Sequence, residues 1–456
     1  MTPTPGMHPD AYASLRAHVR GALIGPGEDG YDAARRVWNG CIDRRPAAIL
    51  TCADAEDIAI ALRLASERGF AVSVRGGGHN VAGRALRDGA LLIDLSRLTG
   101  VWVNAGSQTV TVQGGATWSQ VDEDTARCGL ATTGGLVSST GVGGFTLGGG
   151  AGWLMRKHGL ACDNLLGANV VLGDGRVVRA SAAEHPDLFW ALRGGAGGLG
   201  VVSSFDFRCH PLTHVLAGLI VRSADQALTA LQVFRDFAAA APDEFCGLSV
   251  LTNAPPLPFL DAALHGRPVL IQAVCWCGAE LEGARALAPL RGGGAAAEHI
   301  GWMPYVQWQK LQDAGAPAGL SYYWKTANYA SLADDVLHTL VRALHQLPSP
   351  RSEIHVQHMG GAVSRVPRAD TAFAHRDANF FINVIGVSDT PAAIDTLRQR
   401  VGGLYEQICP GSLPGAMPNF SDQDDESRAS TAGIEATTRL QAIRRRYDPA
   451  GLLSAC

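Results

Sequence analysis

Hydrophobic positions in the first two hundred residues follow two alternating patterns. Residues 9–23 and 54–68 repeat apolar side chains every three or four positions, and each segment opens on an acidic or turn-forming residue, as helices do. Short apolar and β-branched runs predict strands around these helices, at 47–50, 71–74, 91–95 and 109–112. This mixture predicts an α+β domain rather than a long doubly wound sheet.

The pattern changes after Pro211. Longer apolar runs predict strands at 217–221, 246–251 and 269–277, and long helical segments follow at 224–239, 333–346 and 390–406. These elements predict a second domain, in which helices pack on a mostly antiparallel sheet. Proline and glycine interrupt the helical pattern again near 410–414. We therefore divide the chain into residues 1–211, 212–413 and 414–456.

The bulk composition changes this picture little. A chain of 456 residues is too long for one ordinary core, which agrees with two domains. The net charge of -4 at pH 7 argues against nucleic acid or an anionic membrane as a partner. The N-terminal residues lack the pattern of a secretory signal, and no stretch offers about twenty uninterrupted apolar residues. We expect a cytoplasmic enzyme that is a monomer or a homodimer.

The ten cysteines do not suggest a metal site or a redox dithiol. No two of them have the C-x-x-C spacing of a zinc knuckle or a thioredoxin-like motif. Cys275 and Cys277 stand in an apolar run that predicts a core strand, where cysteine acts as a small hydrophobe. We therefore expect no metal.

A glycine turn with a histidine at its end is the main candidate for chemistry. The predicted strand at 71–74 leads directly into Arg75, three glycines, His79 and Asn80. Glycine has no Cβ and takes positive φ, so this backbone can bring its N–H groups against the phosphates of a ligand, with His79 just beyond. Alone, the stretch also fits a glycine-rich hairpin with a solvated histidine. A second glycine cluster at 134–152 favours a cofactor site.

Several ordered motifs share this region. The two glycine clusters are followed by 157–164 (KHGLACDN), by 187–195 (DLFWALRGG) and, near the C-terminus, by 446–449 (RYDP). In this order they resemble the FAD-linked oxidases with a PCMH-type FAD-binding domain, members of the vanillyl-alcohol oxidase superfamily. The similarity is greatest to the berberine-bridge-enzyme-like and 6-hydroxy-D-nicotine oxidase-like branch. The resemblance implies that 1–211 and 414–456 form the FAD-binding domain and that 212–413 form a substrate-binding domain over the flavin.

The resemblance implies FAD as the cofactor, with its diphosphate on the backbone of the first glycine turn. It also implies a covalent bond between His79 and the flavin 8α carbon. Many relatives add a second bond through a cysteine, but Val137 fills that position here, and Cys128 and Cys162 lie off it. We therefore expect a single link. The residues expected to contact FAD are Arg75, Gly76, Gly77, Gly78, His79, Asn80, Gly141, Gly143, Gly144, Leu147, Gly149, Gly150, Asn164, Gly200, Val201 and Asn419.

The catalytic base is not at its usual place. The family commonly carries a tyrosine two positions before the asparagine that matches Asn419, but this chain has Met417, which cannot accept a proton. Period-two alternation places Glu353, His355 and Gln357 on one strand face, which the resemblance turns toward the flavin. We predict His355 as the base and Gln357 as a substrate-positioning residue. An ordinary solvated strand face would give the same pattern.

A second segment offers further candidates. Residues 321–325 read Ser-Tyr-Tyr-Trp-Lys, and aromatic side chains with a polar end suit the wall of a pocket, although adjacent tyrosines also occur in core strands. We expect Tyr322 or Tyr323 in the pocket, and count Tyr323 and Lys325 among the catalytic candidates.

The expected function is a flavin-dependent oxidase. A C–H bond next to oxygen or nitrogen in a small cyclic or natural-product-like substrate would give hydride to the flavin, with molecular oxygen as the final acceptor. A flavin-dependent cyclase or tailoring enzyme of secondary metabolism is one alternative. A flavin-binding protein without catalysis is another.

Overall fold

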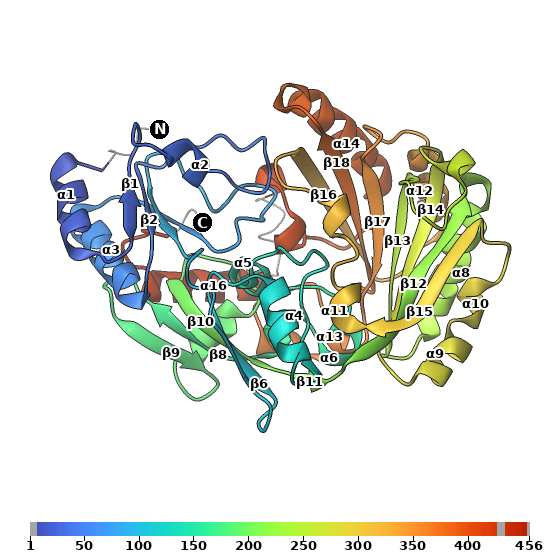
Figure 1. Ribbon diagram of the computed structural model, residues 1–456, viewed down its shortest axis with the longest axis horizontal. Coiled ribbons are helices and arrows are strands. Elements are labelled where there is room, and N and C mark those ends of the chain that lie inside the picture. The colour runs from blue at the N-terminus through green and yellow to red at the C-terminus, as the bar shows by residue number, and fades with distance from the viewer. Residues whose placement is uncertain (1–6, 426–433, 454–456) are drawn as a thin grey trace.

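The computed structural model describes residues 7–425 and 434–453, and it has two bodies side by side (Figure 1). The first part of the chain forms a four-stranded sheet of order β1-β2-β4-β3, in which β2, β4 and β3 run parallel. Its elements are α1 (Pro9–His18), β1 (Ala22–Ile24), α2 (Tyr31–Ala34), β2 (Ala48–Thr51), α3 (Ala55–Arg68), β3 (Val72–Arg75) and β4 (Leu91–Asp94). Helix α3 begins where the Asp54 side chain accepts hydrogen bonds from the N–H groups of Glu56 and Asp57, and it ends at Gly69 in the left-handed region.

A five-stranded antiparallel sheet of order β5-β6-β10-β8-β9 packs below the first sheet. Inward-facing residues such as Val110, Phe205 and Phe207 form its core with Trp118. The strands of this part are β5 (Val101–Asn104), β6 (Thr109–Gln113), β7 (Leu130–Ala131), β8 (Leu165–Val171), β9 (Val177–Ser181), β10 (Val201–Arg208) and β11 (His210–Pro211). The helices are α4 (Trp118–Ala126), α5 (Val142–Leu147), α6 (Met155–His158) and α7 (Pro186–Leu192).

The second body is built on one seven-stranded antiparallel sheet of order β15-β12-β14-β13-β17-β18-β16. Its strands are β12 (His214–Ser223), β13 (Phe245–Asn253), β14 (Pro268–Trp276), β15 (Ala297–Pro304), β16 (Ser321–Tyr329), β17 (Glu353–His358) and β18 (Phe380–Ser388). The helices are α8 (Ala227–Ala240), α9 (Glu280–Ala286), α10 (Ala288–Arg291), α11 (Tyr305–Trp308), α12 (Asp334–Leu344), α13 (Ala362–Arg365) and α14 (Ile394–Ile408).

Alternation along these strands gives the large sheet two different faces. Ile354 and Val356 of β17 pack into the core formed with α8, α12 and α14. Glu353, His355 and Gln357, which alternate with them, therefore point to the other face, which is turned toward the first body (Figure 1). The period-two pattern of the sequence predicts this division correctly.

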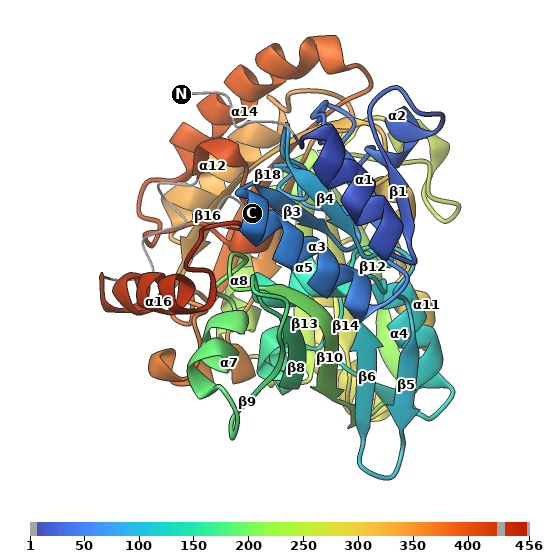
Figure 2. The same cartoon turned by 90° about the vertical axis from the view of Figure 1, so that its left-hand side faces the viewer.

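The chain returns to the first body after α14. Helix α16 (Ile434–Tyr447) lies beside α7, and Leu452 and Leu453 join the core around α3 (Figure 2). The strands of the first body end at 211 and those of the second fall within 214–388, so we keep 211 and 413 as proposed domain boundaries.

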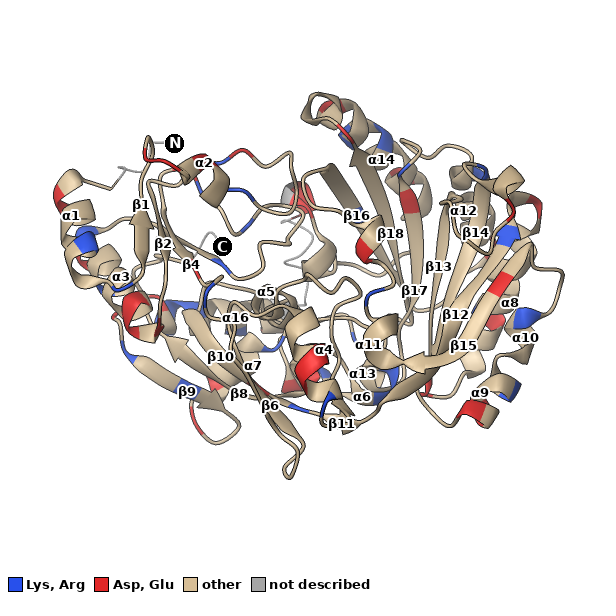
Figure 3. Cartoon of the chain, in the orientation of Figure 1, with Lys and Arg blue, Asp and Glu red and all other residues tan. Residues whose placement is uncertain are grey.

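The mixture of helices with largely antiparallel sheets confirms the α+β class. Among the described residues, no helix has both the length and the apolar character needed to span a membrane. Lysine, arginine, aspartate and glutamate lie interspersed along the chain, without a long segment of one sign (Figure 3).

Candidate active site

A cavity of about 1390 Å³ lies between the glycine loops of the first body and the inward face of the large sheet. Pockets for one small ligand typically measure about 300–1,000 Å³, so this cavity has room for a large cofactor together with a substrate. The C-terminal return contributes to its wall through Pro418, Asn419, Phe420 and residues of α16. The cavity is therefore built from all three parts of the chain.

The two glycine clusters meet backbone to backbone at the wall of this cavity. A Cβ added at Gly77 would lie 2.4 Å from the nitrogen of Gly141, and one added at Gly141 would lie 2.3 Å from the nitrogen of Gly77. Real Cβ atoms do not approach so closely. Both positions therefore require glycine, and their contact fixes the turn that presents His79.

The backbone N–H groups of residues 76–80 are free to donate hydrogen bonds to a ligand. No acceptor among residues 7–425 and 434–453 takes a hydrogen bond from them, although all five residues line the cavity. Convergent free N–H groups of this kind suit the oxygens of a phosphate. The turn therefore fits the diphosphate of FAD without a lysine.

His79 is held in a narrow environment. Its Nε2 lies 3.0 Å from Ser139 Oγ, and its ring stacks on Trp38 with centroids 4.6 Å apart. Trp38 in turn stacks on Tyr322 of β16 at 3.9 Å, so the imidazole is fixed from both bodies. Burial lowers the pKa of His79 to about 4. The ring is therefore neutral at pH 7, as a nucleophilic nitrogen must be.

The position expected for a second covalent link carries no thiol. Val137 lines the cavity, and no cysteine is among the described residues that do. Cys128 is exposed beyond α4, and Cys162 is buried, where the loss of solvent raises the pKa of its thiol well above the ordinary value.

Most residues expected to contact FAD do line the cavity: Gly76, Gly77, Gly78, His79, Asn80, Gly141, Gly143, Gly144, Leu147, Gly200, Val201 and Asn419. Asn419 also accepts a hydrogen bond from the N–H of Gly150 and donates to the carbonyls of Gly144 and Phe145. It thereby joins the C-terminal return to the second glycine loop.

Four expected cofactor contacts are corrected by the structure. Arg75 pairs with its register partner Asp94 on β4 through Nη2 at 2.7 Å and donates to the carbonyl of Ala34. Gly149 and Gly150 pack against Phe373 and Phe145 outside the cavity wall. None of these three residues lines the cavity.

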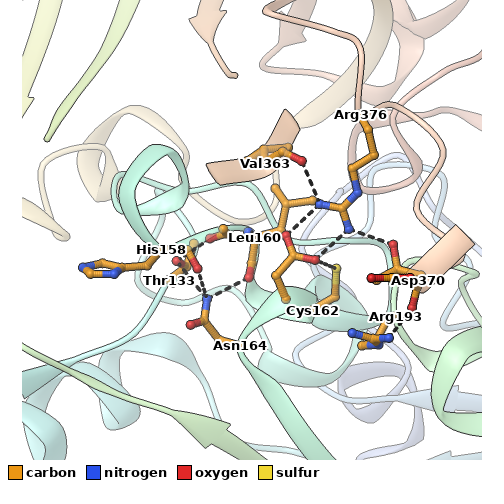
Figure 4. Close-up of polar contacts among 12 residues, drawn as sticks. Thr133, His158, Leu160, Cys162, Asn164, Arg193, Val363, Asp370 and Arg376 are labelled. Atoms are coloured by element: carbon orange, nitrogen blue, oxygen red, sulfur yellow. Dashed lines mark hydrogen bonds and ion pairs between the residues drawn. The ribbon is translucent and has the colours of Figure 1, made fainter. Parts of the chain in front are cut away.

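Asn164 is the fourth correction (Figure 4). Its Nδ2 donates to the carbonyls of His158 and Leu160, and its Oδ1 lies 2.8 Å from His210 Nε2. The side chain is 2% exposed and does not reach the cavity. Asn164 therefore stabilises the turn before β8 rather than a ligand.

His355 lies on the cavity wall opposite the glycine loops. Its Nε2 is 2.7 Å from Glu353 Oε2, two residues earlier on the same strand face. The antiparallel register places Val250 of β13 and Asn383 of β18 directly beside it. His355 thus has a carboxylate partner and an open side toward the cavity.

The other catalytic candidates do not reach the cavity. Gln357 shares the face of His355 but lies deeper, 1% exposed, and donates to the carbonyl of Gly247. Tyr323 and Lys325 are on the opposite, helix-covered side: the Tyr323 hydroxyl donates to Asp424 at 2.6 Å, and Lys325 Nζ lies 2.8 Å from Asp425. The expectation that these three residues lie at the site is wrong. Tyr322 of the same segment does line the cavity.

Three residues of the site are not singled out by the sequence, and Glu353 is placed on the strand face of His355 without a role. Trp38 and Ser139 contact His79, Glu353 contacts His355, and Asn383 lines the cavity with an Oδ1 that has no partner among the described residues. Only Glu353 had a signal, because it alternates with His355. The other contacts join segments that are distant in the sequence. Met417 is fully buried, so the position of the usual tyrosine is part of the core.

Comparison with known proteins agrees with this site. Residues 46–181 match the family model described as an FAD binding domain. Over 455 residues the chain is 28% identical to (R)-6-hydroxynicotine oxidase of Paenarthrobacter nicotinovorans, covering 94% of each chain. The solved structure of glucooligosaccharide oxidase from Acremonium strictum, which carries a 6-S-cysteinyl, 8α-N1-histidyl FAD, superimposes with a TM-score of 0.85 and 25% identity over 97% of each chain. The berberine-bridge-enzyme-like protein 1 of Physcomitrella patens shares the fold, with a TM-score of 0.87, 20% identity and 97% coverage of each chain.

The matched FAD-binding segment contains His79 and its glycine turn, and the similarity extends over both bodies of the molecule. The cavity supplies free N–H groups and a neutral histidine, which suit an FAD linked through a histidine like that of glucooligosaccharide oxidase. The chain therefore carries a PCMH-type FAD-binding domain, and it is an FAD-linked oxidoreductase that is similar over nearly its whole length to these oxidases.

Proposed function

We propose that the protein is an oxidase that removes hydride from a C–H bond next to oxygen or nitrogen in a small cyclic or natural-product-like substrate. Molecular oxygen is the proposed acceptor and becomes hydrogen peroxide, so that two electrons and two protons leave the substrate. The observation that carries this proposal is that His79 and the His355–Glu353 pair line opposite walls of one cavity. FAD, when bound, supplies the hydride acceptor and the route of the electrons to oxygen.

We propose further that FAD has one covalent link, to His79. The support is the low pKa of His79 together with Val137, which leaves no thiol on the cavity wall within the described chain. Trp38 and Ser139 would orient the imidazole toward the bond that forms.

The proposed base is His355. If Nε2 donates its hydrogen to Glu353, Nδ1 is the nitrogen left to accept the proton of the substrate hydroxyl or amine. The Glu353 carboxylate would then stabilise the imidazolium, and the amide of Asn383 would orient the substrate group beside it. Gln357, Tyr323 and Lys325 do not line the cavity, so they cannot contact the substrate there.

The test is anaerobic mixing of the purified protein with a panel of cyclic alcohols, cyclic amines and oligosaccharides. Bleaching of the flavin by a panel member, followed by recovery of the colour and release of hydrogen peroxide on admission of air, would support the proposal. A compound that is turned over to a cyclised product without peroxide would favour a flavin-dependent cyclase or tailoring enzyme. A flavin that dithionite reduces but no panel member does would favour a binding protein.

A further inference from the structure

The cavity wall beside His355 has two unlike sides. In the cross-strand register, His355 of β17 lies opposite Val250 of β13, which lies opposite Ile271 of β14. Leu219 of β12 and Ala273 of β14 face each other in the next row. All four of these apolar residues line the cavity. We call Leu219, Val250, Ile271 and Ala273 the apolar shelf.

The length of the shelf follows from sheet geometry. Neighbouring strands lie about 4.8 Å apart, so Ile271, two strands from His355, is about 10 Å away along the sheet. The strands that carry most of the shelf, β13 and β14, contain no lysine, arginine, aspartate or glutamate (Figure 3). The shelf is therefore an uncharged surface that begins next to the proposed base.

A loop forms a second wall over the shelf. Residues 254–267 join β13 to β14, and Pro255, Pro256 and Leu257 of this loop line the same cavity. Hydrogen bonds from Ala254 N–H to the Arg267 carbonyl and from Gly266 N–H to the Ala254 carbonyl close the base of the loop. A ligand on the shelf would thus have apolar groups on two sides.

The residue directly beside His355 on its other side is polar, although Ile385 and Val387 of the same strand, β18, also line the cavity. This residue, Asn383, is 1% exposed, and Thr326 lies opposite Asn383 on β16. Asn383 Oδ1, on the cavity wall, has no hydrogen-bond partner among the described residues, whereas Thr326 does not line the cavity. Buried polar atoms normally have one, so this side is suited to a polar group of a ligand.

This asymmetry discriminates between classes of substrate. A hydroxyl-rich sugar on the shelf would find no side-chain donor or acceptor on its four residues, and each hydroxyl buried without a partner weakens binding. An apolar group in the same place gains from burial. The shelf therefore disfavours an oligosaccharide chain and favours an apolar one.

We propose that the substrate is an amphiphile whose oxidised group lies at His355 and Asn383 and whose apolar arm, about 10 Å long, lies on the shelf beneath Leu257. This inference rests on the proposed function, because it takes His355 as the site of reaction. It adds the substrate class, a molecule with one polar end and one extended apolar end.

The test uses phenol, 4-ethylphenol, 4-butylphenol and 4-hexylphenol as probes. Each is titrated into the oxidised, flavin-containing protein, and the dissociation constant is read from the change in the visible flavin spectrum. One buried methylene is worth about 0.8 kcal/mol, so each should tighten binding about fourfold until the shelf is full. Equal constants for phenol and 4-hexylphenol, or no spectral response to any probe, would overturn the proposal.

Variants test whether the tighter binding of longer alkyl chains comes from the shelf. Ile271→Asp places a charge on it, and Leu219→Trp fills it with an apolar side chain, so that a folding defect in the first does not remove the test. In both variants the alkyl chain should no longer tighten binding. The dissociation constant for phenol should stay within about twofold of the wild-type value. Leu281→Asp, at a side chain in α9 that is 75% exposed, is the matched control and should keep the gain.

Persistence of the gain in both shelf variants would contradict the proposal. Failure of the proposed function is a separate result, because these constants are measured on the oxidised protein without turnover.

Discussion

Two of the histidines that line the cavity, His79 and His355, have different neighbours. His79 is desolvated between Trp38 and Ser139, which lowers its pKa and keeps the ring neutral. His355 instead has the Glu353 carboxylate at 2.7 Å, a partner that stabilises a charged ring. This contrast agrees with a nucleophilic role for His79 in cofactor attachment and a proton-accepting role for His355.

Replacing His355 should slow the chemical step alone. General-base catalysis is typically worth about a hundredfold to ten-thousandfold, so His355→Ala should reduce the rate of anaerobic flavin reduction by that order. Flavin content should be unchanged, because His355 lies on the wall opposite the glycine loops. Stopped-flow absorbance measures the rate, with His338→Ala as the control at an exposed histidine on α12. A rate near that of the wild type would place the base elsewhere.

The cysteines should be dispensable for flavin attachment. Cys128 and Cys162 do not line the cavity, so Cys128→Ser and Cys162→Ala should each retain bound flavin after denaturation. A peptide map of the digested protein measures this directly. Flavin found on a cysteine-containing peptide would disprove the single link.

Single residues were predictable where the sequence carries local information. His79 and the glycines could be recognised because they lie in one short turn. His355 could be recognised because the alternation of its own strand predicts the face on which its side chain lies. The sequence does not decide between Tyr322 and Tyr323, because which face of β16 each side chain takes depends on the pairing of β16 with β18. Arg75 and Asn164 point away from the cavity because Asp94 and His210, both distant in sequence, bind their side chains.

Among the elements, the two glycine loops depend most on each other. Gly77→Ala would insert a methyl group into backbone of the facing loop, an overpacking that typically costs about 1–3 kcal/mol of stability. We expect lower flavin content and a lower free energy of unfolding, measured by absorbance and urea denaturation. In the control Gly402→Ala, on α14 with open space around it, the same change should stabilise by about 0.5–1 kcal/mol. Full flavin content in Gly77→Ala would contradict the loop contact.

Most elements follow from their patterns, with shifts of a few residues at the ends. The helix predicted at 9–23 ends at His18, and that predicted at 390–406 begins as α14 at Ile394. Short elements such as α5 and α6 were not predicted, because glycine and basic residues hide a helical turn that tertiary contacts stabilise. The strand order of the large sheet could not be predicted from the sequence, because it depends on pairing between strands that are distant in the sequence.

At the scale of the whole molecule, a buried ion pair joins the two bodies. Arg376 binds Asp163 through two hydrogen bonds of 2.6 and 2.7 Å and also donates to the carbonyl of Val363 (Figure 4). Both side chains are less than 10% exposed. Because the cavity lies between the bodies, this pair helps to fix the distance between its walls.

Breaking this pair should destabilise the fold strongly. Asp163→Asn leaves the Arg376 charge buried, and such a loss typically costs about 3–5 kcal/mol. Asp243→Asn, which breaks the exposed pair with Arg365, should cost less than about 1 kcal/mol. Urea unfolding followed by far-UV circular dichroism compares the two. Equal effects of both substitutions would show that the Arg376 pair does not hold the bodies together.

The central claim is that this cavity holds FAD attached to His79. The most direct measurement is the intact mass of the acid-denatured protein, wild type beside His79→Ala, with the flavin in each supernatant measured by fluorescence. We predict that the wild type keeps one FAD per chain and that His79→Ala has the mass of the polypeptide alone. A wild-type chain that releases all its flavin, or a His79→Ala chain that still carries one, would contradict the claim.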